Sequence, residues 1–537
     1  MRPAFRVGRL AAAVASIAVI VGLSVPAAQA QTLRWASQGD PQTMDPYSQN
    51  ELLTNAINGQ IYEFLVARDR QLNLVPALAT EWKQEGPLKW VFKLRQGVKF
   101  QDGKPFTADD VVFSIARAKE KTSQIAVYAS ALGEPKKIDD YTVEFGLTQP
   151  NPIFLQHLNT VYIMSKAWCE ENKVTRPLDF TNKEESYTSL HANGTGPYRL
   201  VSRAPDIKTV LERNPTYWGK IEGNVQSVVY TPIKSPATRV AALISGELDF
   251  VLDPPPTDVE RLRSTPGLKV IDGPENRIVF IGMDQGRDEL LYSSVKGKNP
   301  FKDLRVRQAL YHAIDIETIK RTLMRGLSIP TGELFTHQVY GYFPAANKRP
   351  PFDIDKAKAL LKEAGYPDGF EVTLDCPNDR YINDALICQA LTSMWAKIGL
   401  KVKLDAMPKA QYFAKINKHD TSLYMLGWAV ATFDAQDALL SLVHTPNGKG
   451  AGEYNDGSYS NPKMDALIDA MQTEGDVKKR LEMIHEALTM HTQDVAHMML
   501  HQQIIPWAMR KNVDVTHSAD NRLRMWWVRV NDGNGKQ

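Results

Sequence analysis

The chain has 537 residues, 43% of them hydrophobic and 23% charged, which is more material than one hydrophobic core of roughly 250–300 residues can use. Its 64 basic and 61 acidic residues nearly cancel, and three of the basic ones, Arg2, Arg6 and Arg9, lie in the first thirty residues, which hold no acidic residue. The rest of the chain is therefore balanced in charge and has no run of Lys or Arg, which excludes nucleic acid and anionic membrane surfaces as expected partners.

The first thirty residues are predicted to be a signal peptide. The three arginines precede an apolar run from Leu10 to Leu23, which is followed by Pro26 and the small-residue sequence Ala28-Gln29-Ala30, an order typical of secretory signals. The apolar run is shorter than the roughly 20 residues of a membrane-spanning helix. Because no cysteine near the expected cleavage point offers a thiol for lipid attachment, we expect a free periplasmic protein that starts near Gln31.

The first predicted elements are a hairpin and a helix. Apolar and polar side chains alternate from Trp90 to Arg95, and Gln96-Gly97 predicts a turn into a second strand at Val98–Phe100. Thr107, three residues before Asp110, indicates the start of a helix that runs through Ala118.

The middle of the chain alternates helices with strands. One apolar helical face runs from Val306 to Leu323, until Gly326 can end the helix. A helix over residues 357–364, a strand over 370–374, a helix over 384–397 and a strand over 400–404 follow in order. This spacing predicts an α/β lobe with parallel strand pairing.

Three cysteines occur in a chain expected in an oxidising compartment. Cys376 and Cys388 are candidates for a disulfide that fastens a strand end to the following helix, which would leave Cys169 free. The alternative is three buried free thiols, because sequence alone does not fix the pairing.

Six sequence blocks, taken in order, resemble the pattern of a known family. They are Leu94–Ser114, Gly194–Tyr198, Arg213–Gly219, Gly246–Asp249, Phe301–Leu310 and Ala357–Tyr366. On these blocks the chain resembles the extracellular solute-binding protein family 5, the dipeptide-, oligopeptide- and nickel-binding proteins of ABC importers. Most of these residues have structural interpretations, as glycines that permit special backbone conformations or as core. They therefore identify the fold rather than the ligand.

The resemblance implies an α/β, bilobed periplasmic-binding-protein fold of the large, three-subdomain type, with a hinge between the lobes. Lobe I would comprise residues 31–283 plus 504–537, with an inserted subdomain at about 71–190, and lobe II would comprise residues 284–503. Such lobes close on a solute, which stabilises the closed state by binding it more tightly.

The segment from Gly427 to Asp437 is the first candidate for ligand binding. In peptide binders of the family, an aspartate three residues after an equivalent Gly-Trp receives the peptide's ammonium group, but here that position is Ala431. Asp434 or Asp437 could replace it, with a helix-start acid as the alternative interpretation. Trp428 would offer an aromatic face to the ligand, and core packing is its alternative.

Arg380 and Tyr381 are the second candidate, because related dipeptide binders carry an arginine in this region that holds the peptide carboxylate. The planar guanidinium suits a bidentate carboxylate contact, and a surface salt bridge is the alternative. His497, His501 and His444 are candidate nickel ligands, because nickel carriers share this fold. The apolar neighbours of the first two indicate a buried strand instead, so no metal or cofactor is expected.

The sequence is compatible with three functions. The first is a monomeric periplasmic receptor that captures peptides or peptide-like small solutes and delivers them to the permease of an ABC importer. The second, favoured by Ala431, is a carrier of a metal chelate or another non-peptide solute. The third is a secreted zinc hydrolase using His485, Glu486 and His491, although their spacing matches no zinc-protease motif. We therefore expect a binding protein rather than an enzyme.

Overall fold

The computed structural model of the protein describes residues 31–531, so the predicted signal peptide lies outside the described residues. Within this range no helix is both long and apolar enough to cross a bilayer. The fold is mixed α/β, with the following helices: α1 (Leu52–Asn58), α2 (Ala108–Ala118), α3 (Ala126–Ala129), α4 (Phe154–Leu158), α5 (Lys166–Glu171), α6 (Pro236–Ser245), α7 (Val259–Ser264), α8 (Leu304–His312), α9 (Ile316–Thr318), α10 (Ile354–Glu363), α11 (Asp384–Ala396), α12 (Lys409–Ile416), α13 (Ala435–Ala438), α14 (Pro462–Met471) and α15 (Val477–Asp494).

The strands form one large sheet and three small ones. Their bounds are β1 (Thr32–Ser37), β2 (Val66–Arg68), β3 (Leu74–Pro76), β4 (Ala79–Gln84), β5 (Lys89–Leu94), β6 (Glu134–Asp139), β7 (Thr142–Gly146), β8 (Tyr198–Ala204), β9 (Lys208–Arg213), β10 (Ser227–Pro232), β11 (Phe250–Leu252), β12 (Leu268–Met283), β13 (Ser328–Pro330), β14 (Glu371–Pro377), β15 (Lys401–Met407), β16 (Leu423–Ala429), β17 (Met498–Arg510), β18 (Val513–Asp514) and β19 (Arg529–Val530).

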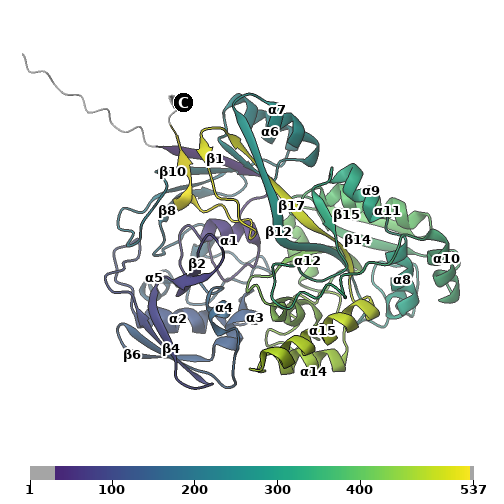
Figure 1. The fold of residues 1–537 in the computed structure, drawn as a ribbon, viewed down its shortest axis with the longest axis horizontal. Coiled ribbons are helices and arrows are strands. Elements are labelled where there is room, and N and C mark those ends of the chain that lie inside the picture. Colours follow the sequence, from purple (N-terminus) through teal and green to yellow (C-terminus); the bar gives the residue numbers. More distant parts are fainter. Residues whose placement is uncertain (1–30, 532–537) are drawn as a thin grey trace, which may run out of the picture.

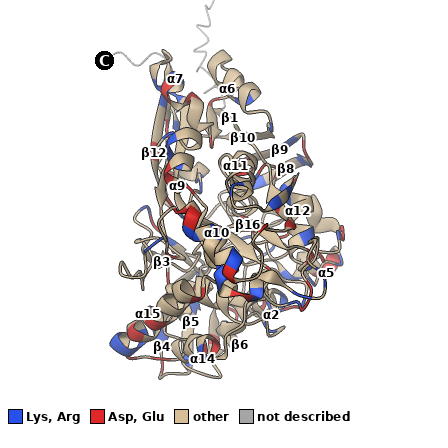
Figure 2. Ribbon diagram, turned by 90° about the vertical axis from the view of Figure 1, so that its right-hand side faces the viewer, with Lys and Arg blue, Asp and Glu red and all other residues tan. Residues whose placement is uncertain are grey.

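Two long strands, β12 and β17, connect the halves of the molecule. The large sheet has the order β15-β14-β16-β12-β17-β11-β1-β10-β9-β8, with β13 also paired to β17. One end of the β12–β17 pair adjoins β11, and the other end adjoins β16. In Figure 1 the pair runs between a half that contains α1 to α5 and a half that contains α8 to α11. Figure 2 shows basic and acidic residues interspersed over the ribbon, as the balanced composition suggests.

The ladder between β12 and β17 is interrupted between Pro274 and Ile278. Side-chain amides make hydrogen bonds there: Gln502 Nε2 donates to the carbonyl of Glu275 at 2.8 Å, and Gln503 Nε2 donates to its carboxylate at 2.8 Å. Asn276 Nδ2 donates to the carbonyl of Val430 at 2.9 Å, which links the interruption to the end of β16.

The predicted hairpin near the start of the chain is wrong in its pairing. β5 forms from the alternating segment, but it pairs with β4 and β7. Val98 and Phe100 are instead buried, and Lys99 makes only an isolated bridge to Pro105. After Gly97, at φ +76, this segment enters the core because its apolar side chains are better buried than left on a sheet edge.

The predicted helix start at Thr107 is confirmed. Thr107 is the N-cap of α2, and its backbone N–H donates to Asp110 Oδ2 at 2.9 Å. The predicted continuous helix over 306–323 is wrong, because α8 ends at His312 and the chain restarts in α9 and a π-helical turn, Ile319–Leu323. Asp315 causes the restart, since its carboxylate caps α9 by accepting from Thr318 N at 3.0 Å.

The strand–helix–strand prediction in the second half is confirmed. α10 is followed by β14, α11 and β15, and β14 pairs with β15 in parallel. Gly365 and Gly399 follow the two helices with φ +90 and +92, the left-handed conformation that glycine adopts without strain.

Candidate ligand-binding site

A cavity of about 300 Å³ lies between the two halves, at the lower end of the range of roughly 300–1,000 Å³ for small-molecule sites. Its wall comes from α1 and the segments around it, from the interrupted part of β12, from β16 and from a segment near the C-terminus. Much of the wall is aromatic, contributed by Tyr62, Phe64, Tyr128, Tyr162, Tyr217, Trp218, Tyr381, Phe413, Trp428, Phe433, Tyr454 and Trp526.

Trp428 lies near the end of β16 and faces this cavity. It is only 7% exposed, and its ring centroid lies 4.9 Å from that of Tyr454. Its indole Nε1 donates to Asp437 Oδ1 at 3.0 Å. Trp428 is thus packed on one side and open to the cavity on the other, so the two interpretations of this residue are compatible.

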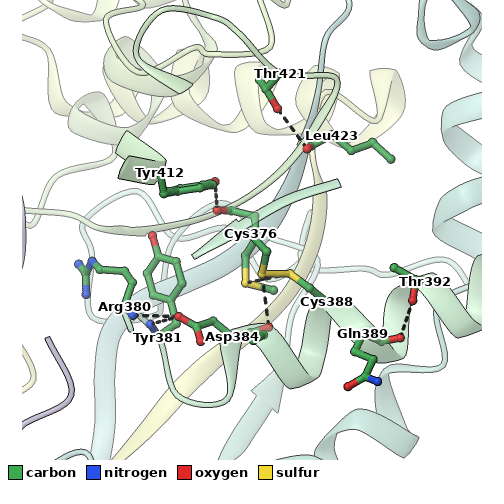
Figure 3. Close-up of a disulfide and its surroundings, with 12 residues drawn as sticks. Cys376, Arg380, Tyr381, Asp384, Cys388, Gln389, Thr392, Tyr412, Thr421 and Leu423 are labelled. Carbon is green, nitrogen blue, oxygen red and sulfur yellow. Dashed lines mark hydrogen bonds between the residues drawn. A yellow bond between two sulfur atoms is a disulfide. The ribbon is translucent and has the colours of Figure 1, made fainter. Parts of the chain in front are cut away.

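The predicted disulfide between Cys376 and Cys388 is present, and Cys169 is free and buried. The disulfide fastens the end of β14 to α11 (Figure 3). Its two Cα atoms lie 6.6 Å apart. The intervening loop is also held by Asp384, whose Oδ2 accepts from the backbone N–H groups of Arg380 at 2.9 Å and Tyr381 at 3.0 Å. Burial raises the pKa of Asp384 to about 7.

This loop brings Arg380 and Tyr381 to the cavity wall, and their role in ligand binding stays a prediction. The hydroxyl of Tyr381 accepts from Gly427 N at 2.8 Å, beside Trp428. Arg380 Nε lies 3.2 Å from Glu51 Oε1, although the pair is not aligned as a hydrogen bond. The positive charge of Arg380 is therefore partly neutralised before any ligand arrives.

Glu51 joins the two halves through a buried charge cluster. It caps α1, and Lys409 Nζ donates to its Oε2 at 3.1 Å. Burial alone would raise the pKa of Glu51, but the charges of Lys409 and Arg380 hold it well below its ordinary value. One buried carboxylate from the first half thus holds two cations from the second.

A segment near the C-terminus, residues 519–526, was missed by the sequence analysis. Asp520, Arg522 and Arg524 line the cavity. Arg524 donates two hydrogen bonds to Asp520, from Nη1 to Oδ1 at 3.1 Å and from Nη2 to Oδ2 at 2.5 Å. Arg522 Nε is buried without a hydrogen-bond partner, and the Arg522 side chain makes no salt bridge to any residue within 31–531. The only signal in the sequence was two basic residues two apart before a tryptophan pair.

Arg68 and Glu63 line the same cavity. Arg68 donates to three neutral oxygens, those of Asn159 at 2.9 Å, Leu72 at 2.7 Å and Thr432 at 3.0 Å, and its burial lowers its pKa to about 10. Glu63 accepts from neutral groups, namely Trp218 Nε1 at 2.9 Å and the hydroxyls of Thr195 and Tyr217. Burial raises the pKa of Glu63 to about 7, against the effect of these donors.

Asp434 and Asp437 are not cavity-lining residues, which corrects the expectation that one of them replaces the missing acid at position 431. Asp434 caps α13 and is paired with buried Arg480 at 2.6 and 2.8 Å. Asp437 lies behind Trp428 and also accepts from Thr432 N at 3.0 Å. Ala431 itself lies in the cavity wall.

The candidate metal-ligand histidines are packed into the protein. His501 is fully buried in β17, His491 Nε2 and His497 Nδ1 lie 3.0 Å apart, and His444 lies beside Asp469. The other two residues of the hydrolase hypothesis have separate partners. The ring of His485 stacks on that of Phe343 with the centroids 4.0 Å apart, and Glu486 Oε1 lies 2.8 Å from Lys463 Nζ. Within residues 31–531 no group of three potential ligands is arranged to hold a metal ion.

Comparison with known proteins identifies the family. The model of the bacterial extracellular solute-binding proteins, family 5 (middle region), matches residues 73–450. The chain belongs to this family. A family 5 relative, the dipeptide-binding protein of Escherichia coli, is 27% identical over 536 residues, which cover 94% of this chain and 95% of that protein. The glutathione-binding protein GsiB of Salmonella paratyphi A is 27% identical, with 91% of each chain covered.

Solved structures of family 5 solute-binding proteins have the same fold. The dipeptide-binding protein of Pseudoalteromonas sp. SM9913, in complex with Met-Leu, superposes with a TM-score of 0.83 at 23% identity and covers 93% of this chain and 100% of that chain. The predicted α/β, bilobed periplasmic-binding-protein fold is thus confirmed.

Proposed function

We propose that this protein is a periplasmic receptor of an ABC importer, which captures a peptide or a peptide-like small solute and delivers it to the membrane permease. The observation that carries the proposal is the cavity between the two halves, whose wall takes residues from both. A ligand that contacts residues of both halves stabilises the closed arrangement, and the permease can recognise the closed form. Aromatic faces and neutral amides along the wall suit a compact amphipathic solute.

We also propose that the lobes are residues 31–283 plus 504–537, with an inserted subdomain at about 71–190, and residues 284–503. The interruption between Pro274 and Ile278, opposite Gln502 and Ile504, supports two crossings in neighbouring strands. It suggests that the first crossing bends a few residues before 283. The chain would be exported by its first thirty residues and act as a monomer.

The test is closure on binding, measured with the mature protein. Isothermal titration calorimetry with a panel of di- and tripeptides should find a solute with about micromolar affinity, and small-angle scattering should show a smaller radius of gyration in its presence. Trp428→Phe should weaken binding, whereas Trp82→Phe, in β4 away from the cavity, should leave it unchanged. If the panel and a periplasmic extract both fail to bind, or if a solute is chemically converted, the proposal is wrong.

A second candidate is a carrier of a non-peptide solute, including a metal chelate. Ala431 in the cavity wall favours it, because a buried ammonium group without a paired carboxylate costs several kcal/mol, on the order estimated for unpaired buried ions. A metal chelate would be held through its organic part, since no histidine belongs to the described cavity wall.

A further inference from the structure

The charges on the cavity wall are strongly asymmetric. Five arginines line it, Arg68, Arg277, Arg380, Arg522 and Arg524, against the two carboxylates of Glu63 and Asp520. The whole chain is nearly neutral, so this excess is a local property of the cavity. A cavity lined by one sign of charge attracts solutes of the opposite sign.

Neither carboxylate of the wall is available to a cationic group on a ligand. Asp520 is held by both terminal nitrogens of Arg524. Glu63 is surrounded by donors from Trp218 and two hydroxyl groups. A solute with a free ammonium group would therefore lose its hydration without gaining an ion pair, which is costly.

The arginines differ in what already balances them. Arg277 is bound to Glu275 at 3.0 Å, Arg380 lies beside Glu51 and Arg524 is bound to Asp520. Arg68 has only neutral acceptors, and Arg522 makes no side-chain hydrogen bond or salt bridge within residues 31–531. The charges of Asp520, Arg522 and Arg524 all act on Arg68, and those of Arg522 and Arg524 also act on Asp520. Three arginines thus share one carboxylate, which leaves an excess of positive charge in this part of the wall.

We infer that the solute is an acid whose carboxylate is received by Arg522, with Arg68 and Arg524 beside it, and whose amino group is absent or blocked. The ligand class is an amine-blocked acidic peptide or a similar small organic acid, with its apolar part against Trp428. A planar guanidinium with a free edge binds a carboxylate bidentately. This inference rests on the proposed function and narrows its substrate class.

The first experiment compares three matched probes by calorimetry on the mature protein: N-acetyl-Ala-Glu, Ala-Glu and N-acetyl-Ala-Gln-amide. The blocked acid should bind at least tenfold more tightly than the free amine, and the neutral amide should bind weakest. Equal or tighter binding of the free amine than of the blocked acid would overturn the inference while leaving the proposed receptor function intact.

The second experiment assigns the site. Arg522→Gln should weaken binding of N-acetyl-Ala-Glu at least tenfold, Arg522→Lys should retain part of the affinity, and Arg199→Gln, an exposed arginine on β8, should change nothing. Unchanged affinity in a folded Arg522→Gln, checked by its thermal midpoint, would overturn the assignment.

If none of the probes binds, native mass spectrometry of solute retained from the periplasm decides: an acid without a free amine supports the inference, and an ammonium-bearing solute overturns it. No retained solute, with no closure in any extract, overturns the receptor function as well.

Discussion

Two segments far apart in the chain bring arginines to the cavity, one from the loop 378–383 and two from the segment 519–526, and the segments differ in how tightly the protein holds them. The loop 378–383 is enclosed by a disulfide, bound by Asp384 and tied to Glu51 through Arg380. The segment 519–526 is held mainly by the pair of Asp520 and Arg524, and it leaves Arg522 without a side-chain partner among the described residues. The charge of Arg380 therefore serves largely to join the halves, whereas the charge of Arg522 is the one that we propose a ligand receives.

The largest expected effect is on the anchor of the loop. Glu51→Gln should lower the free energy of unfolding by about 3–5 kcal/mol, because Arg380 and Lys409 would both lose a buried partner. Urea denaturation measures this loss. The exposed Glu371→Gln should change stability by less than about 0.5 kcal/mol. A loss equally small for Glu51→Gln would mean that the cluster contributes little to joining the halves.

Asp384, which holds the loop, should also make the free energy of unfolding depend on pH. The folded pKa of Asp384 is about 7 and its ordinary value is 3.8, so the unfolded chain releases this proton first as pH rises. Below pH about 4, Asp384 makes its full contribution to the free energy of unfolding. As pH rises to about 7, the free energy of unfolding should fall by up to about 4 kcal/mol. Asp384→Asn should flatten this slope, and the exposed Asp368→Asn should not. An unchanged slope in Asp384→Asn would contradict the raised pKa.

Removal of the disulfide should have a somewhat smaller effect. Cys376→Ser with Cys388→Ser frees a loop closed over a separation of 12 residues, which should lower the free energy of unfolding by about 3 kcal/mol. Reductant should destabilise the natural protein by a similar amount and leave the double variant unaffected. Ligand affinity should fall too, because Arg380 and Tyr381 lose their fixed positions. Equal responses of both proteins to reductant would exclude this bond as the cause.

The smallest effect is expected in the second segment. Asp520→Asn removes a negative charge from the wall and releases Arg524, so N-acetyl-Ala-Glu should bind about fivefold more tightly, equivalent to about 1 kcal/mol. Calorimetry measures the change, with Asp272→Asn, whose carboxylate pairs with Arg263 outside the cavity wall, as control. Weaker binding would instead show that Asp520 serves to position Arg524.

Local sequence rules predicted the elements whose stabilising contacts are local. The cap at Thr107, the helix ends at Gly365 and Gly399 and the disulfide all depend on neighbouring residues, and all are present. The pairing of β5 with β7 was not predictable in this way, because β7 lies about fifty residues further along the chain. The helix break at Asp315 was missed because an apolar face continued across it.

The candidate site was predictable only in part. Trp428, Arg380 and Tyr381 were indicated by a family pattern, and all three lie in the cavity wall. Asp434 and Asp437 stood at plausible positions in the sequence, but Arg480, more than forty residues away, takes the first carboxylate, and Trp428 takes the second. Arg522 lies in no recognised motif, and only the return of the C-terminal segment to the first half brings it to the cavity.

The interruption between β12 and β17 has a mechanical consequence. A backbone ladder fixes the distance between its strands, so bending it breaks hydrogen bonds in the interior. Between Pro274 and Ile278 the bonds to Glu275 come instead from the amides of Gln502 and Gln503, each on a stem with several rotatable torsions. Such tethers can follow the backbone through an arc while still donating, so the joint can flex without leaving polar groups unsatisfied.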